Sequence, residues 1–170
     1  MEGKNNLDSS NRSGKIQANK ITPFLWFNDN AEEAIDFYLS VFRNSEMGIV
    51  TRYTSSGPGK AGSVMTATFV LEGQQFVALN GGPHFKFSEA ISFVVSCADQ
   101  EEIDFFWERL SEGGQKSQCG WLKDKFGLSW QIVPGNIGEL LQGPDPEKTK
   151  RAVQALMKMT KIEIAGLINA

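Results

Sequence analysis

The sequence has few of the residues that bind metals or carry out acid–base chemistry. Its 170 residues include one histidine, His84, and two cysteines, Cys97 and Cys119. One chain therefore cannot offer several imidazoles or four thiolates to a metal ion, and a Ser-His-Asp triad could form only around His84. No apolar run approaches the roughly 20 residues that span a bilayer, so we expect no membrane-spanning helix.

Charge of one sign is not in excess either. The chain has 17 Lys and Arg against 20 Asp and Glu, which gives a net charge of −3. Such a slightly acidic surface does not attract polyphosphate, so we expect no nucleic-acid partner. Two cysteines without a recognisable secretory leader predict reduced thiols in a cytoplasmic protein. The apolar share of 41% is that of an ordinary globular domain.

The sequence divides into three parts. Residues 1–20 are rich in Asn, Ser, Lys and Gly without hydrophobic periodicity, which predicts a disordered extension. Residues 21–134 alternate strand-like and helix-like patterns and form the expected domain. Residues 135–170 carry apolar stripes at helical spacing after a cap at Asp145-Pro146. These stripes must pack on the domain or on a second subunit.

The domain is expected to contain two helices, each opened by an acidic cap. Asp29 is followed by Glu32, and Asp99 is followed by Glu102. The expected strands are Ile21–Phe27, Met47–Thr54, Ser63–Leu71, Gln75–Asn80, Ala90–Cys97, Lys116–Trp121 and Leu128–Val133.

The two helices indicate a repeat. The first contains Ile35–Tyr38 (IDFY) and the second contains Ile103–Phe106 (IDFF), 68 residues later. The strands that precede the helices align at the same offset. The match could be a coincidence between two amphipathic helices. Otherwise it is a duplicated strand–helix–strand–strand–strand module, and two such modules pack as one α+β domain.

A set of short motifs also carries a family likeness. The motifs are Trp26-Phe27, Ala34–Tyr38, Asn80–Pro83, Ser88–Ala90, Asp99–Asp104, Cys119–Trp121, Asp124–Gly127 and Ser129–Ile132. In order and spacing they resemble the PhnB-like branch of the vicinal oxygen chelate superfamily, often labelled demethylubiquinone methyltransferase-like. The superfamily includes glyoxalases, extradiol dioxygenases and bleomycin-resistance proteins. The resemblance implies a homodimer and two βαβββ modules that form a cupped mixed sheet, the glyoxalase/bleomycin-resistance fold, with C-terminal helices added.

Metal-dependent members of this superfamily hold one divalent ion with four side chains, usually His, Gln or Glu, from four strands of the cup. Position by position, the resemblance places these ligands at Phe24, Asn80, Ser92 and Gln131, with Ala78 as the neighbouring option for the second. None of them is charged or an imidazole, and neutral amide or hydroxyl oxygens bind Zn²⁺ and Fe²⁺ poorly. We therefore expect no metal and no cofactor. A weakly bound divalent metal is the alternative.

Strand alternation gives a second view of the cup. Ser92 lies on the opposite face from Phe93, and Gln131 shares its face with Ser129. The resulting cup has aromatic walls and a few amide and hydroxyl groups, which suits a small, mostly apolar ligand. The residues expected to line it are Phe24, Trp26, Asn80, Ser92, Trp121, Trp130 and Gln131. The alternative is that these side chains fill a closed core.

Cys119 and His84 are the candidate catalytic residues. Cys119 could act as a nucleophile if a cation or a histidine stabilises its thiolate. His84, in the loop between the modules, could gate the cup or act as an acid or a base. The alternatives are a packed thiol and a surface-loop histidine.

Two functions follow from these residues. The first is a metal-free protein that binds a small aromatic or hydrophobic molecule. The second is a lyase- or isomerase-type enzyme that uses Cys119, His84 or a weakly bound metal. The sequence disfavours the methyltransferase label, because Gly81-Gly82-Pro83 follows a strand but opens no amphipathic helix.

Overall fold

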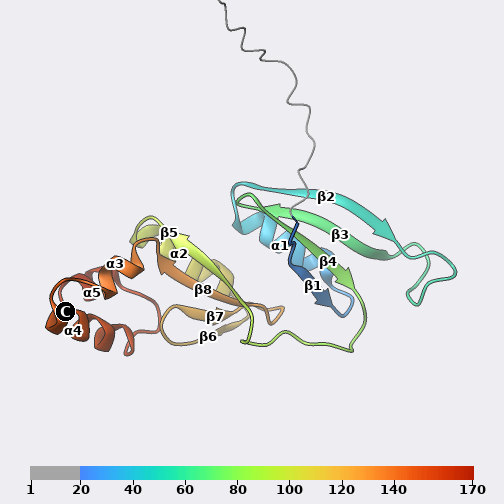
Figure 1. Cartoon of the computed structure of the whole chain (residues 1–170). Helices are drawn as coiled ribbons and strands as arrows, with labels where there is room; N and C mark the ends of the chain where they lie inside the picture. Colours follow the sequence, from blue (N-terminus) through green and yellow to red (C-terminus); the bar gives the residue numbers. More distant parts are fainter. Residues whose placement is uncertain (1–19) are drawn as a thin grey trace, which may run out of the picture.

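In the computed structural model, which describes residues 20–170, the chain forms two mixed sheets (Figure 1). The elements are β1 (Phe24–Phe27), α1 (Ala31–Val41), β2 (Ser45–Arg52), β3 (Val64–Leu71), β4 (Gln74–Asn80), β5 (Ser92–Cys97), α2 (Gln100–Ser111), β6 (Gln115–Lys116), β7 (Trp121–Lys123), β8 (Ser129–Pro134), α3 (Ile137–Leu141), α4 (Pro146–Leu156) and α5 (Ile164–Ile168). The first sheet has the order β1-β4-β3-β2 and the second the order β5-β8-β7-β6. The predicted pair of βαβββ modules is confirmed.

The helix caps differ between the two modules. Helix α2 begins as predicted, because Asp99 accepts a hydrogen bond from the backbone N–H of Glu102 and the Glu102 carboxylate accepts one from the N–H of Ala98. Helix α1 begins one residue later than its predicted cap: its N-terminal residue is preceded by Asn30, not Asp29, and the Asn30 side chain makes no capping bond.

The predicted strand over Lys116–Trp121 is interrupted. Strand β6 ends at Lys116 and β7 begins at Trp121. Between them Cys119 and Gly120 have φ angles of 57° and 81°, which no strand residue adopts. The apolar and polar alternation of this segment does not reveal the left-handed turn.

Each sheet has one covered face and one open face. Helix α1 packs on the first sheet, α2 packs on the second, and these helix-bearing faces meet in a shared core. The ring centroids of Tyr38 in α1 and Trp130 in β8 are 5.7 Å apart, and those of Phe76 in β4 and Phe93 in β5 are 5.1 Å apart. The opposite faces are uncovered, since Phe24 is 57% exposed. The two open faces therefore point away from the shared core.

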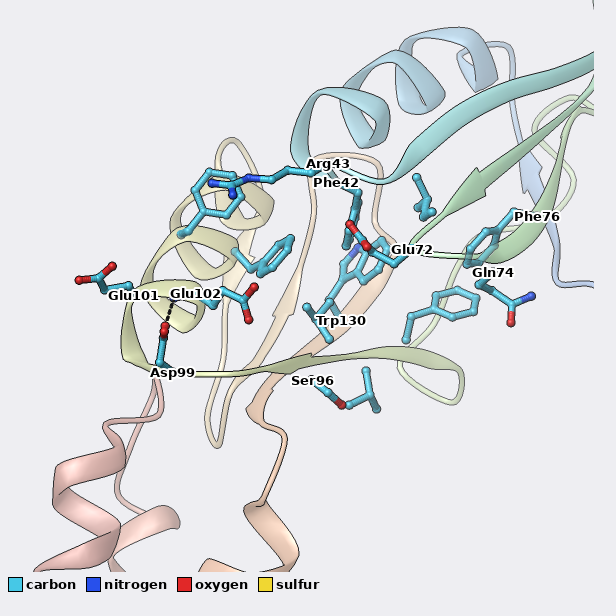
Figure 2. Close-up of a pocket in the computed structure, with 16 residues that line it drawn as sticks. Phe42, Arg43, Glu72, Gln74, Phe76, Ser96, Asp99, Glu101, Glu102 and Trp130 are labelled. Carbon is cyan, nitrogen blue, oxygen red and sulfur yellow. Dashed lines mark hydrogen bonds between the residues drawn. The ribbon is translucent and has the colours of Figure 1, made fainter.

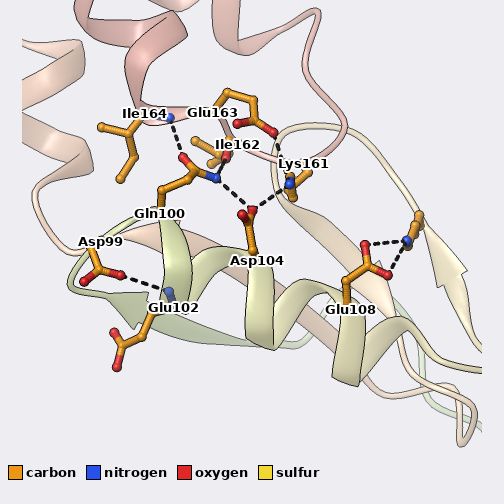
Figure 3. A network of polar contacts seen from close by, with 10 residues as sticks. Asp99, Gln100, Glu102, Asp104, Glu108, Lys161, Ile162, Glu163 and Ile164 are labelled. Carbon is orange, nitrogen blue, oxygen red and sulfur yellow. Dashed lines mark hydrogen bonds and ion pairs between the residues drawn. The ribbon is translucent and has the colours of Figure 1, made fainter.

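Helices α3, α4 and α5 pack on one another beside the second module (Figure 1). The segment between α4 and α5 bonds to the turn between β6 and β7, where the N–H groups of Cys119 and Gly120 donate to the carbonyls of Met159 and Thr160, each at 2.8 Å. The connection to α2 is polar (Figure 3): the Gln100 amide donates to the carbonyl of Ile162 at 3.1 Å and accepts from the N–H of Ile164 at 2.9 Å. Lys161 forms an ion pair with Asp104 at 2.5 Å. Ile162 itself is 1% exposed. The C-terminal extension is thus held by its own chain.

Two further predictions concern the N-terminal segment and membrane-spanning helices. The disordered extension predicted for residues 1–20 lies, except for Lys20, outside the described residues. Within residues 20–170, no helix is both long and apolar enough to cross a membrane.

Candidate functional site

The open face of the second sheet carries a polar pair. Gln131 on β8 donates from Nε2 to the Ser92 hydroxyl on β5 at 2.8 Å. Trp121 on β7 is the strand partner of Gln131, and Val94, which follows on the same face of β5, is 55% exposed. Ser92, Trp121 and Gln131, all predicted to line a pocket, thus share one face with an exposed apolar neighbour.

The open face of the first sheet is aromatic. Phe24 and Trp26 lie on this face of β1, and the Trp26 indole donates to the carbonyl of Gly82 at 2.8 Å. Phe85 meets the Trp26 ring edge-on, with the centroids 4.9 Å apart. Across the part of the chain that the structure describes, no hydrogen bond or ring contact joins these residues to the Ser92–Gln131 pair. One chain therefore does not bring the two predicted groups together.

Asn80 is not on either open face, which corrects its predicted place in the pocket. Its side-chain oxygen accepts from the N–H of Ala31 at 2.9 Å and so caps helix α1. Its side-chain nitrogen donates to the Glu32 carboxylate at 2.7 Å and to the carbonyl of Val64 at 3.1 Å. All hydrogen-bonding atoms of this amide are used to join α1 to the first sheet.

Trp130 is also placed differently from its prediction. It is 3% exposed and lies on the helix-bearing face of β8, opposite Gln131. Its ring centroid is 5.5 Å from that of Phe42, and its indole nitrogen donates to Asp124 at 2.9 Å. Trp130 is therefore a core residue, because neighbouring residues of a strand point to opposite faces.

The structure does not assemble Cys119 and His84 into a catalytic site. The Cys119 thiol lies 3.5 Å from the carbonyl oxygen of Leu156 and 3.9 Å from the sulfur of Met157, both at the end of α4. A carbonyl oxygen and a thioether do not stabilise a thiolate. His84 is exposed in the loop that follows β4.

The positions where the resemblance places metal ligands do not form a coordination site. Phe24 offers no donor atom, Asn80 is fully used as a cap, and Ser92 and Gln131 bond each other. Within residues 20–170, no three His, Cys, Asp or Glu side chains lie close enough together to hold a metal ion. The donors present do not fit a divalent metal.

A cleft of about 960 Å³ lies between the two modules (Figure 2). Its lining is aromatic and acidic: Phe42, Phe76, Phe93, Phe105, Phe106 and Trp130 with Glu72, Asp99, Glu101 and Glu102. Asp99 and Glu102 already cap α2, and Glu72 accepts from the N–H of Asn44 at 3.1 Å. Sequence reasoning missed this cleft. Of its aromatic residues only Trp130 was predicted to line a pocket, and that pocket was the cup.

A smaller pocket of about 200 Å³ lies on the open face of the second sheet. Trp121, Lys123 and Ser129 line it, and Glu89 closes it through an ion pair with Lys123. Ser129 is 1% exposed, and its hydroxyl is the single buried side-chain polar atom without a hydrogen-bond partner in residues 20–170. The sequence places Ser129 on the face of Gln131 but does not mark it as functional.

Solved structures share this architecture. The fosfomycin resistance protein FosX from Listeria monocytogenes is 16% identical, with a TM-score of 0.52 over 76% of this chain and 100% of that chain. Protein PA1353 from Pseudomonas aeruginosa is 20% identical, with a TM-score of 0.56 over 69% of this chain and 98% of that chain. The fold is that of the glyoxalase/bleomycin-resistance proteins in the vicinal oxygen chelate superfamily.

A narrower likeness shows the family. The profile of the 3-demethylubiquinone-9 3-methyltransferase family matches residues 19–133. A PhnB protein from Bacillus cereus, whose name carries the same methyltransferase description, is 41% identical, with a TM-score of 0.62 over 68% of this chain and 99% of that chain. The chain therefore belongs to the PhnB-like family that bears this methyltransferase name, and the predicted resemblance is confirmed.

The family match ends before the C-terminal extension. It stops at residue 133, so α3, α4 and α5 lie outside it. No curated protein matches the chain.

Proposed function

We propose that the protein binds a small aromatic or hydrophobic molecule, without a metal ion, in a cup that two copies of the chain complete. One observation carries this proposal: each sheet leaves a face uncovered, and the two faces differ in chemistry. Phe24 on the first and Val94 on the second lie on the edge strands β1 and β5 and are more than half exposed, so each open face carries an apolar side chain that nothing in the chain covers. The Ser92–Gln131 pair supplies a polar handle beside them.

The second copy is part of the proposal because one chain keeps the two faces apart. Strands β1 and β5 each have a neighbour on one side only, so each has a free edge. If β1 of one copy lies beside β5 of the other, the aromatic face and the Ser92–Gln131 pair surround the same space. Ile91, directly before β5 and 69% exposed, is covered by that contact.

The proposal does not include methyl transfer. Adenosylmethionine-dependent enzymes of the common fold bind the cofactor at a glycine-rich turn between a strand of a parallel sheet and a helix. Here Gly81 and Gly82 follow β4, but the next element is strand β5 and not a helix, and β4 lies in a mixed sheet, parallel to β1 and antiparallel to β3. The methyltransferase name of the relatives is therefore not carried over to this chain.

A thiol- or histidine-based enzyme is also less well supported. The surroundings of Cys119 do not activate a thiolate, and His84 is exposed in a loop. The thiols bear instead on where the protein is located. Cys97 and Cys119 are both unpaired thiols, which is typical of a reducing compartment. A cytoplasmic location is therefore part of the proposal.

Tryptophan fluorescence with 1-naphthol, a neutral aromatic probe, tests the cup. Saturable quenching is expected, and Phe24→Ala should weaken it about fivefold because an apolar contact is lost. Phe105→Ala is the matched control: Phe105 lines the cleft between the modules, so its loss should not affect 1-naphthol. Sedimentation should give a dimer at micromolar concentration. A monomer, or binding lost only in the Phe105 variant, contradicts the proposal.

A further inference from the structure

The Ser129 hydroxyl needs a partner that a ligand can supply. Ser129 is 1% exposed, and its Oγ has no hydrogen-bond partner among the residues of the described chain. Buried hydroxyls are almost always hydrogen-bonded, because losing water without a replacement is costly. The residue lines the small pocket of about 200 Å³. An acceptor group bound in this pocket can accept a hydrogen bond from the Ser129 hydroxyl.

Lys123 supplies a positive charge next to Ser129. The two residues are partners in the β7–β8 ladder, so their side chains are neighbours on the open face. The Lys123 ammonium is paired with Glu89, whose side chain is 64% exposed and lies before β5. The hydrogen bond from Lys123 lowers the pKa of the Glu89 carboxyl. A carboxylate of the protein itself is thus paired with the Lys123 ammonium, on a side chain that is mostly exposed to water.

Trp121 connects this pocket to the proposed cup, because it lines the pocket and is the strand partner of Gln131. We propose that the ligand is a small carboxylic acid whose carboxylate displaces Glu89, binds the Lys123 ammonium and accepts a hydrogen bond from the Ser129 hydroxyl. Its apolar part lies along Trp121 toward the cup. This inference rests on the proposed function and adds the chemical class of the ligand. The pocket has the liquid volume of roughly seven water molecules, which is enough for a carboxylate and its first carbons.

Acetate and its neutral analogue acetamide test the pocket alone. In proton–nitrogen correlation spectra of the full chain, acetate should shift the amide signals of Lys123 and Ser129 saturably, and acetamide should not. Ser129→Ala should weaken acetate binding about fivefold, the effect of one hydrogen bond. Glu89→Gln should tighten it about threefold, because the competing carboxylate is removed. Ser96→Ala, a second serine on the same face outside the pocket, is the matched control and should bind as the wild type does.

Both test variants are expected to fold. Ser129→Ala removes an unpaired buried hydroxyl, and Glu89→Gln alters an exposed side chain. The inference is overturned if acetamide shifts the same signals as strongly as acetate, if acetate shifts spread over all exposed lysines, or if both variants bind acetate as the wild type does.

The acetate and 1-naphthol experiments fail separately, because 1-naphthol has no carboxylate. Acetate binding without 1-naphthol binding contradicts the cup but keeps the carboxylate site. Binding of 1-naphthol without acetate binding contradicts the carboxylate site alone.

Discussion

The Tyr38 hydroxyl in α1 donates a hydrogen bond of 2.8 Å to Oδ2 of Asp124, 86 residues further along the chain, and so joins the two modules. Asp124 also accepts from the Trp130 indole at 2.9 Å and from the N–H groups of Phe126 and Leu128 at 2.9 and 3.0 Å. Burial raises the pKa of the Asp124 carboxyl, and these hydrogen bonds offset part of that rise. All four hydrogen-bond partners of the Asp124 carboxylate are donors. The carboxylate therefore forms a buried polar contact between the two modules.

Removing either partner of this bond should destabilise the fold. Tyr38→Phe deletes one hydrogen bond to a buried carboxylate and should lower the free energy of unfolding by about 2 kcal/mol. Asp124→Asn should cost about 3 kcal/mol, because an amide nitrogen at the Oδ2 position meets the Trp130 N–H, which cannot accept. Urea unfolding measures both. Asp36→Asn, which alters an exposed carboxyl on the same helix, is the control. Wild-type stability of the Asp124 variant contradicts the assignment.

Tyr38 also predicts how stability responds to alkali. Burial, then the charge and hydrogen bond of Asp124, raises the pKa of Tyr38 well above its usual 10.0. The folded state therefore keeps the phenol proton while the unfolded state loses it. Stability from this group is complete below pH 10 and falls above it by about 1.4 kcal/mol per pH unit.

The measurement is the dependence of the free energy of unfolding on pH, with tyrosinate absorbance recorded in parallel. Tyr53→Phe leaves Tyr38 as the only tyrosine of the two in the chain. In that variant tyrosinate should appear only as the protein unfolds, and in Tyr38→Phe the alkaline loss of stability should be smaller. Tyrosinate signal from Tyr38 in the folded protein contradicts this prediction.

The two thiols should react at very different rates. Cys97 is 1% exposed, and burial followed by the charges of Glu102 and Asp99 raises its pKa to about 12. Near pH 8 only about one in ten thousand Cys97 thiols is then ionised. Cys119 is partly exposed in the turn between β6 and β7, where its thiol lies beside the end of α4. A disulfide reagent should therefore label one thiol quickly, and Cys119→Ser but not Cys97→Ser should abolish that fast phase. Two fast phases would contradict the burial of Cys97.

Chelation should leave the protein unchanged. The open face of the second sheet offers the Ser92 hydroxyl and the Gln131 amide. They bond each other and do not fit a divalent ion. If the protein works without a metal, dialysis against EDTA should change the free energy of unfolding by less than about 0.5 kcal/mol, and 1-naphthol binding should persist. One equivalent of a transition metal that survives purification, with binding lost on its removal, contradicts the metal-free proposal.

Local patterns predicted the elements well but not the relation between the modules. Hydrophobic spacing over one or two turns indicated helices α1 and α2, and the repeat of Ile35–Tyr38 at Ile103–Phe106 indicated the duplicated module. One of the contacts that join the modules links Tyr38 to Asp124, and nothing local to either residue marks it. The cleft depends on how the two modules meet, so it became visible only in three dimensions.

The site residues divide for a similar reason. Alternation along β5 and β8 was enough to place Ser92 and Gln131 on the lining face, but not to show that they bond each other. The same alternation places Trp130 on the other face, where the structure finds it buried. Asn80 could not be recognised as a cap from its sequence, because the helix it caps begins 49 residues earlier. Ser129 was on the right face, but only the structure reveals that its hydroxyl is unpaired.

The C-terminal extension should detach when its link to α2 is cut. Gln100 makes two hydrogen bonds to the backbone of Ile162 and Ile164 (Figure 3), and both are partly buried. Gln100→Ala should lower stability by about 2 kcal/mol and expose the segment before α5 to proteolysis. Lys161→Ala should cost less than about 1 kcal/mol, since the pair it forms with Asp104 is partly exposed. Limited proteolysis of the two variants side by side measures the difference. Equal protection of the extension in Gln100→Ala and in the wild type contradicts this assignment. The apolar contact of Ile162 would then be enough to hold the extension without the Gln100 amide.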